Sequence, residues 1–190
     1  FPDKEKRIRV IEKVVDKDTV VVQSCSSQAD SNYMELFFIV DALKRSGAKS
    51  VTAVVPYLGY QRQDHVFRSG EAVSLEVVIE TLESTGLNRL IAFDLHSIKI
   101  PELFHIPVVH LSALSIFAEE IKKNKWNEND TVLVSPDMGG IRRIKLISEM
   151  LDDMPFATIV KERDLKTGEV STSGIKGEIK KRVIIVDDMI

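Results

Sequence analysis

The stretch Val183–Asp188 (VIIVDD) says more about the fold than any other part of the chain. Four β-branched residues follow one another and lead directly into two carboxylates, Asp187 and Asp188. Short continuous apolar runs of this kind are typical of buried strands in parallel sheets. Open α/β sheets bind ligands outside the carboxyl ends of their strands, so the pattern predicts a parallel strand that delivers two acids to a binding edge. A strand that ends in a solvated acidic turn fits these residues equally well.

Strand-like and helix-like segments alternate along the rest of the chain. Asn32 and Glu35 have the spacing of a capping box, which predicts a helix that Asn32 begins and Gly47 ends. A polar hairpin is expected over 161–181. The alternation predicts an α/β fold with mainly parallel sheets that carry helices on both faces. Strands are expected at 19–23, 50–55, 89–93, 108–110, 131–135, 156–160 and 183–186, and further helices at 74–85, 111–124 and 140–150.

Composition limits the classes of protein to which the chain can belong. Its 190 residues are 44% hydrophobic and 29% charged, which suits one large or two small globular domains. We expect two similar halves, 1–110 and 111–190. The net charge of −3, without a basic stripe, argues against nucleic acid as a partner, and no apolar run approaches the roughly 20 residues that cross a membrane. The single cysteine, Cys25, excludes an internal disulfide, fits a reducing compartment and is expected to be a small buried residue.

Unusual polar clusters follow the predicted strands, and adjacent strand ends of one sheet converge in space. The first cluster, Tyr57–His65, is a long loop of the kind that often has a function. Arg62 offers a fork of donors for phosphate, and Gln63 offers an amide that could read a base edge. A solvated surface loop is the alternative.

Two further clusters carry residues suited to metal or phosphate. His96, in the segment Phe93–Ser97, fits a core residue, a general base or a metal ligand. Asp137, in Ser135–Gly140, is a hard oxygen ligand suited to Mg²⁺. Gly139-Gly140 allows close backbone approach at a helix N-terminus, a good place for phosphate, although a tight strand-to-helix turn is the simpler interpretation.

A fourth cluster, Lys161–Asp164, lies at the mouth of the predicted hairpin. Its cations, Lys161 and Arg163, could clamp a phosphoryl group during transfer. Taken alone, the segment is also an ordinary charged turn.

Taken together, these segments resemble the ribose-phosphate diphosphokinase (PRPP synthetase) family, and VIIVDDMI resembles the opening of the PRPP-binding motif. The chain has neither a Walker phosphate loop nor a Rossmann glycine motif, which suits a family that binds ATP without a P-loop. The matching segments are FPDKE at 1–5, MEL at 34–36, DALKR at 41–45, PYLGYQRQD at 56–64, DLHS at 94–97, SPDMGG at 135–140, KERD at 161–164 and VDDMI at 186–190.

The resemblance implies an enzyme that transfers the diphosphoryl group of ATP to ribose 5-phosphate, giving PRPP and AMP. It implies two phosphoribosyltransferase-type domains, 1–110 without its first strand and 111–190 incomplete. The chain would then be a fragment cut within its PRPP motif, with little activity alone. The resemblance also implies a cytoplasmic homo-oligomer, such as dimers that assemble into a hexamer, with sites that involve neighbouring subunits.

The same resemblance assigns roles to individual residues. Lys161 and Arg163 would be catalytic, and Asp187 and Asp188 would bind the hydroxyls of ribose 5-phosphate. Mg²⁺ would be served by His96 and Asp137. The residues that would bind ATP are Phe1, Asp3, Glu5, Arg62, Gln63 and His96.

Some positions depart from the family pattern, and two other functions stay open. Gln61 stands where the family often has a small residue, His65 replaces a frequent basic residue, and Lys4 replaces a usual glycine. A non-catalytic regulatory homologue or a phosphoribosyltransferase that consumes PRPP could share the fold. The presence of all four clusters favours the enzyme over the regulatory homologue, and the RQD and DLHS segments have no evident task in a transferase.

Overall fold

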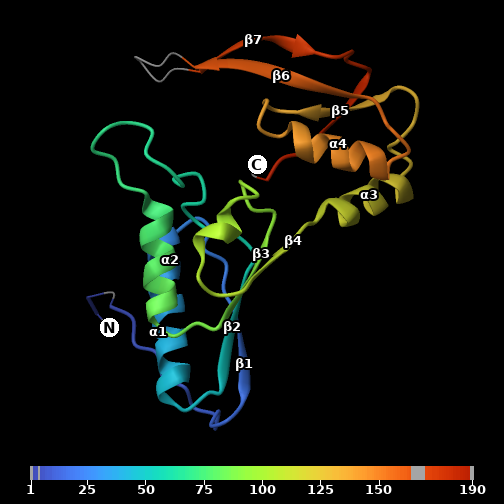
Figure 1. Ribbon diagram of the computed structural model, residues 1–190. Helices are drawn as coiled ribbons and strands as arrows, with labels where there is room; N and C mark the ends of the chain where they lie inside the picture. Colours follow the sequence, from blue (N-terminus) through green and yellow to red (C-terminus); the bar gives the residue numbers. More distant parts are fainter. Residues whose placement is uncertain (1, 4, 164–169, 189–190) are drawn as a thin grey trace. The chain divides into compact units, whose positions relative to one another are not determined.

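The computed structural model describes residues 2–3, 5–163 and 170–188 (Figure 1). The chain forms two compact units, Phe1–Leu111 and Ser112–Ile190, each with its own sheet and core. Within the part of the chain that is described, no helix combines the length and the apolar character needed to cross a membrane.

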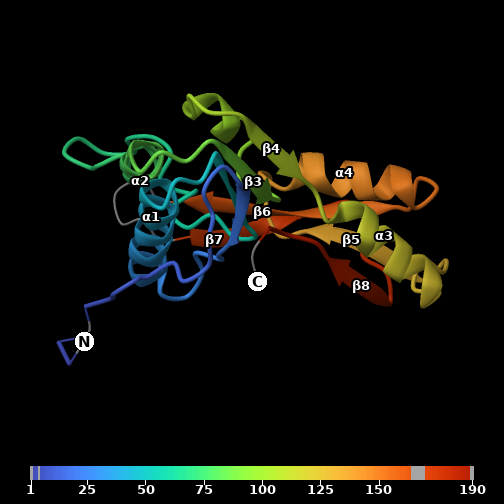
Figure 2. The ribbon, with the colours of Figure 1, turned by 90° about the horizontal axis from the view of Figure 1, so that it is seen from below.

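The first unit contains β1 (Asp18–Val22), α1 (Ala29–Arg45), β2 (Ser50–Val55), α2 (Ser74–Ser84), β3 (Arg89–Phe93), the short 3-10 helix η1 (Ile100–Leu103) and β4 (Val108–Leu111). The strands form a parallel sheet in the order β1-β2-β3-β4. Helices α1 and α2 lie together on one face (Figures 1 and 2), so the prediction of helices on both faces is wrong for this sheet. Crossover connections between parallel strands are right-handed. Because the strands of this sheet follow one another in sequence order, each crossover places its helix on the same face.

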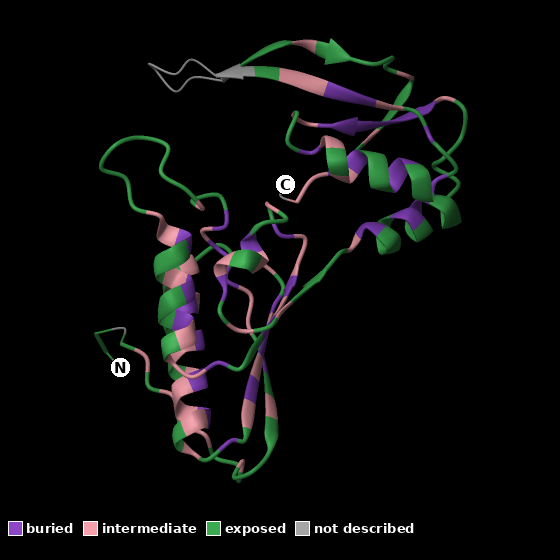
Figure 3. Cartoon of the chain, in the orientation of Figure 1, coloured by how far each residue is buried: buried purple, intermediate pink, exposed green. Residues whose placement is uncertain are grey.

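The two faces of the first sheet differ in burial. Apolar side chains of α1 and α2 pack on alternate residues of the central strands, and the opposite face is partly exposed (Figure 3). On that opposite face of the edge strand β1, Val20 is 66% and Val22 is 68% exposed. The buried set includes Leu36, Val40, Val51, Ala53, Leu75, Ile79 and Leu90.

Helix α1 begins at Ala29 with Gln28 as its N-cap, four residues earlier than the capping box predicts. Asn32 already lies inside the helix, where its backbone N–H donates to Gln28 O at 3.0 Å and its side-chain amide donates to Ser26 O at 2.7 Å. Glu35 pairs with Lys6 at 2.8 Å instead of reaching back to the backbone. The capping-box prediction is therefore wrong, because Asn32 and Glu35 bind Ser26 and Lys6 instead of the backbone N–H groups of the first turn.

The second unit contains α3 (Leu114–Lys123), β5 (Thr131–Ser135), α4 (Ile141–Met150), β6 (Phe156–Arg163), β7 (Val170–Lys176) and β8 (Arg182–Ile185). The strand order is β7-β6-β5-β8, with β5 parallel to both β6 and β8. Strands β6 and β7 are antiparallel, which confirms the predicted hairpin. Helices α3 and α4 pack on one face, and all five residues of β5 are buried.

Strand β8 lies at the edge of the second sheet, next to β5 alone among the described strands. Its parallel direction is as predicted, but its burial is not. Ile184 packs against the core beneath α3 and α4, whereas Val183 is 44% and Ile185 is 60% exposed. Since none of the described elements covers the second face of β8, this strand buries only alternate side chains, and the prediction of a fully buried strand is wrong for the described residues.

Candidate functional site

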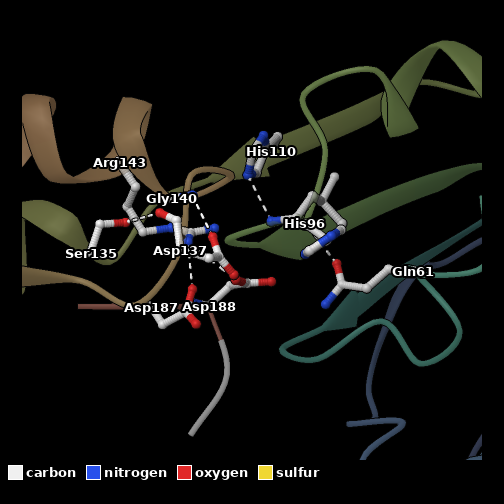
Figure 4. A network of polar contacts seen from close by, with 10 residues as sticks. Gln61, His96, His110, Ser135, Asp137, Gly140, Arg143, Asp187 and Asp188 are labelled. Atoms are coloured by element: carbon white, nitrogen blue, oxygen red, sulfur yellow. Dashed lines mark hydrogen bonds and ion pairs between the residues drawn. The ribbon is translucent and has the colours of Figure 1, made fainter. Parts of the chain in front are cut away.

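In the first unit, two side chains hold the turn that follows β3. Gln61 is only 2% exposed, and its Oε1 accepts a hydrogen bond from the backbone N–H of His96 at 2.8 Å (Figure 4). His110 Nε2 accepts one from the N–H of Leu95 at 3.0 Å. The turn begins at Asp94, whose φ of 41° lies in the left-handed region. The backbone N–H groups of Leu95 and His96 are thus both held by side chains. The His96 side chain itself is exposed at the end of the strand.

The loop that follows β2 carries Arg62 and Gln63, both of which are exposed. Gln63 Oε1 accepts a hydrogen bond from Ser74 Oγ at 2.7 Å, and Gln63 O accepts one from the N–H of Leu75 at 3.2 Å. Gln63 therefore anchors the start of α2. Its reading of a base edge stays a prediction, as does phosphate binding by Arg62.

The N-terminal segment is only partly described. Phe1 lies outside the described residues, and Asp3 Oδ1 accepts a hydrogen bond from the N–H of Glu5 at 3.0 Å, which makes a local turn. ATP binding by Phe1, Asp3 and Glu5 stays a prediction. A hollow of about 550 Å³ is lined by Glu5, Lys6, Asp30, Ser31, Met34 and Phe38.

In the second unit, a compact turn joins β5 to α4. Ser135 Oγ donates to Asp137 O at 2.8 Å, and the N–H of Gly140 donates to Asp137 Oδ1 at 3.0 Å. Gly140 is buried, and a Cβ atom at this position would collide with Ser135 Oγ. The predicted tight strand-to-helix turn is therefore present, with the half-buried carboxylate of Asp137 held by its own backbone.

The acidic pair follows β8, one strand away from that turn. Arg143 Nη1 lies 3.0 Å from Asp187 Oδ1 and 3.1 Å from Asp188 Oδ1 (Figure 4). Desolvation and the neighbouring Asp188 raise the pKa of Asp187, although Arg143 acts in the opposite direction. The alternative of a simple solvated turn does not describe these carboxylates, whose side chains are only 24% and 7% exposed.

The charged hairpin is described in part. Lys161 is exposed on β6, and Arg163 ends the same strand, but its side chain lies outside the described part of the structure. Strands β6 and β7 pair through this region, with an irregularity between Val160 and Lys161. Lys161–Arg163 of the segment predicted as a charged turn thus belong to β6, and Asp164 lies outside the described residues. The catalytic roles of both cations stay predictions.

Among the residues that the structure describes, no group of three or more His, Cys, Asp or Glu side chains gathers as a metal site. Asp137 presents a carboxylate of the hard oxygen type that suits Mg²⁺. Protein sites commonly hold this ion with one or two carboxylates and the phosphates of a substrate. The residues present fit that mode, and a shared site of His96 and Asp137 stays a prediction.

Cys25 is completely buried, and this burial raises its pKa to about 12. This burial confirms the prediction of a small buried residue. A thiol with so high a pKa stays protonated at neutral pH and is a poor nucleophile. Sequence reasoning did not assign roles to Gln61, His110 or Arg143. Of these three residues, only Gln61 had been noted in the sequence, as a departure from the family pattern.

Two domain models of known protein families match the chain, in the same order as the motifs found in the sequence. Residues 1–86 match the N-terminal domain of ribose phosphate pyrophosphokinase, and residues 110–190 match the phosphoribosyl transferase domain. Ribose-phosphate pyrophosphokinase of Fusobacterium nucleatum is 37% identical across 100% of this chain and 60% of its own length. Ribose-phosphate pyrophosphokinase 1 of Streptococcus agalactiae is 38% identical across 100% of this chain and 59% of its own.

A solved structure gives the same result. The crystal structure of phosphoribosylpyrophosphate synthetase from Mycobacterium smegmatis matches with a TM-score of 0.87 and 32% identity, over 99% of this chain and 60% of that one. The chain therefore spans about 60% of the length of the curated relatives that it matches. Two domain matches in the family's order, together with relatives aligned along the whole chain, show that it belongs to the ribose-phosphate pyrophosphokinase family.

Proposed function

We propose that the protein is a ribose-phosphate diphosphokinase, which transfers the β,γ-diphosphoryl group of ATP to the 1-hydroxyl of ribose 5-phosphate. The observation that carries this proposal lies within the second unit. Strands β5 and β8 are parallel neighbours, with Val134 beside Ile185. The Asp137 turn and the Asp187-Asp188 pair therefore leave adjacent strands at the same sheet edge, where α/β folds bind ligands.

The chemistry of this reaction suits the residues present. Direct displacement at phosphorus requires positioning and charge neutralisation more than an enzyme nucleophile. Asp187 and Asp188 would accept hydrogen bonds from the ribose hydroxyls, and Lys161 and Arg163 would offset the charge that grows in the transition state. Bound Mg²⁺ would neutralise phosphate charge, held by Asp137 and, directly or through water, by His96. The proposed nucleotide contacts are Phe1, Asp3, Glu5, Arg62, Gln63 and His96.

The decisive test uses the full-length protein with ATP, ribose 5-phosphate and Mg²⁺, followed by ³¹P NMR. We expect PRPP and AMP to form in equal amounts. Consumption of PRPP with a base, without its synthesis, would indicate a phosphoribosyltransferase instead. No turnover by the pure protein, combined with an altered rate of a catalytic homologue, would indicate a regulatory partner.

The cations of the hairpin provide a second test. Lys161→Ala and Arg163→Ala should each lower kcat by about 10²–10³, with a smaller effect on KM for ATP, because they act on transition-state charge. Lys176→Ala is a matched control, since Lys176 is an exposed cation on the paired strand β7. Near-wild-type kcat in both variants would remove the catalytic role of Lys161 and Arg163.

We also propose a homo-oligomer of the dimer-to-hexamer type, two phosphoribosyltransferase-type domains divided at 110/111, and a cytoplasmic location. Family membership supports the assembly, and the buried, reduced Cys25 suits the location. Sedimentation velocity of the full-length protein measures the assembly, and a monomer at micromolar concentration would contradict it.

A further inference from the structure

Arg143 makes a double contact that the proposed chemistry does not use. It lies in the first turn of α4, and the same nitrogen, Nη1, approaches both Asp187 and Asp188 within 3.1 Å. Its side chain is only 16% exposed. Arg142, the preceding residue on the helix, is exposed. Two adjacent arginines therefore have different surroundings, and only Arg143 is built into the acidic edge.

The acidic pair needs a compensating charge. Two neighbouring carboxylates repel each other, and partial burial disfavours the charged form of each. Two groups favour the ionised form of Asp187, the backbone N–H of Asp188 and the guanidinium of Arg143, and Arg143 is the cation among them. Without this cation, the pair would share a proton more readily, and a protonated carboxyl loses part of its capacity to accept hydrogen bonds.

Arg143 also connects two turns of the second unit. Helix α4 begins after Gly140, whose N–H is held by Asp137 Oδ1. The arginine three residues later reaches the end of the adjacent strand, β8. The N–H of Asp188 donates to Asp187 Oδ1 at 2.9 Å, the same oxygen that Arg143 contacts at 3.0 Å. The position of the acidic pair is therefore fixed relative to the Asp137 turn.

We infer that Arg143 is a positioning residue for the ribose subsite, which keeps Asp187 and Asp188 ionised and in register with the Asp137 turn. This inference rests on the proposed function, in which the two carboxylates bind the hydroxyls of ribose 5-phosphate. Arg143 acts through the acids and is not assigned a contact with substrate. A purely structural link between α4 and β8 is the competing interpretation.

The first measurement does not depend on activity. In the full-length protein, ¹³C NMR of the aspartate carboxyl groups follows the titration of Asp187 and Asp188 in wild type, Arg143→Gln, Arg143→Lys and Arg142→Gln. Removal of the cation should raise the pKa values of the pair in Arg143→Gln. Arg143→Lys, which keeps the charge, should restore most of the effect, and Arg142→Gln should titrate like wild type.

The second measurement is the pH dependence of KM. In Arg143→Gln, KM for ribose 5-phosphate should rise about tenfold near pH 6 and return toward the wild-type value as the acids ionise at higher pH. KM for ATP should change less. If Arg143 were only a structural link, Arg143→Gln would lower thermal stability, and any rise in KM for ribose 5-phosphate would be the same at low and high pH.

The outcomes separate the inference from the proposed function. Identical carboxyl titrations in Arg143→Gln and Arg142→Gln would overturn the inference, whatever the activity. If the variants titrate as expected but the wild-type protein makes no PRPP from ribose 5-phosphate, the proposed function fails and the charge role of Arg143 stands. Should Arg143→Gln not fold, Arg143→Met takes its place in the same titration, because it keeps much of the side-chain length and removes the charge.

Discussion

Gln61 holds the turn after β3 through one hydrogen bond to the backbone N–H of His96. Its side chain is almost fully buried, so the amide is placed by packing as well as by that bond. Most of the polar residues predicted to act on substrate are exposed. The residues that position them, Gln61 and Arg143, are largely buried, because precise placement requires a side chain with little rotational freedom.

Replacement of Gln61 by Met tests this role, because Met has a similar length and no strong acceptor. The N–H of His96 would lose its partner, at a cost of about 1–3 kcal/mol in the free energy of unfolding. Hydrogen exchange of the His96 amide should become faster than in wild type. Gln28→Met, a change at an exposed glutamine, is the control, and unchanged exchange at His96 in Gln61→Met would contradict the positioning role.

Gly140 provides a second test at the residue scale. Its φ of −78° is open to any residue, so the need for glycine comes from the neighbouring Ser135 Oγ and not from the backbone. Gly140→Ala should therefore destabilise the second unit by about 1–3 kcal/mol, measured by urea unfolding.

The double variant Ser135→Ala/Gly140→Ala should recover part of that loss, because the colliding hydroxyl is absent. Gly139→Ala is the milder control, since its Cβ would meet Asp137 Oδ1 at 3.2 Å. Equal effects at Gly139 and Gly140 would show that the contact with Ser135 is not what requires glycine at 140.

At the scale of elements, Glu83 joins the end of α2 to the segment before β4. Burial alone would raise its pKa, but hydrogen bonds from the His105 side chain and from the backbone N–H groups of His105 and Ile106 lower it below its ordinary value. A carboxylate of lowered pKa contributes stability above its unfolded pKa, about 4.3, and this contribution is lost as the pH falls through the folded pKa.

Glu83→Gln should therefore lower the free energy of unfolding by about 1 kcal/mol at neutral pH. The difference from wild type should shrink as the pH falls below about 4, where the wild-type carboxylate is also protonated. Chemical unfolding between pH 3 and 7 measures the effect. Glu80→Gln, at an exposed position of the same helix, should show little change, and a pH-independent difference for Glu83→Gln would contradict the ionised contact.

At the scale of the whole molecule, each core draws its residues from one unit only. Leu36 belongs to the core of the first unit and Ile144 to that of the second, and both are fully buried. Trp126 is the single tryptophan and lies in the second unit, so its fluorescence reports on that unit. The stability of each unit can therefore be followed separately.

Leu36→Ala and Ile144→Ala should each cost about 2–5 kcal/mol of stability, because each leaves a cavity in a close-packed core. Ile144→Ala should shift the Trp126 unfolding transition strongly. Leu36→Ala should instead accelerate hydrogen exchange in β1–β3 and leave the Trp126 transition nearly in place. A common shift of both probes in both variants would show that the units unfold as one.

Local sequence patterns were enough to predict the order and type of most elements and the polar clusters that follow the strands. Apolar runs such as Val183–Val186 and turn residues such as Gly139-Gly140 act over a few neighbours, so their effects can be read locally. The order of these clusters also identified the family. The start of α1 was predicted wrongly, because Asn32 and Glu35 bind Ser26 and Lys6 and do not cap the helix.

Which faces of the sheets are covered, and which distant residues are in contact, became visible only in the folded chain. The sequential strand order of the first sheet placed α1 and α2 on one face, and the edge position of β8 left Val183 and Ile185 exposed. Gln61 meets His96 across 35 residues of sequence, and Arg143 meets Asp187 across 44. These contacts depend on which strands become neighbours, a property of the assembled sheet that local periodicity does not encode.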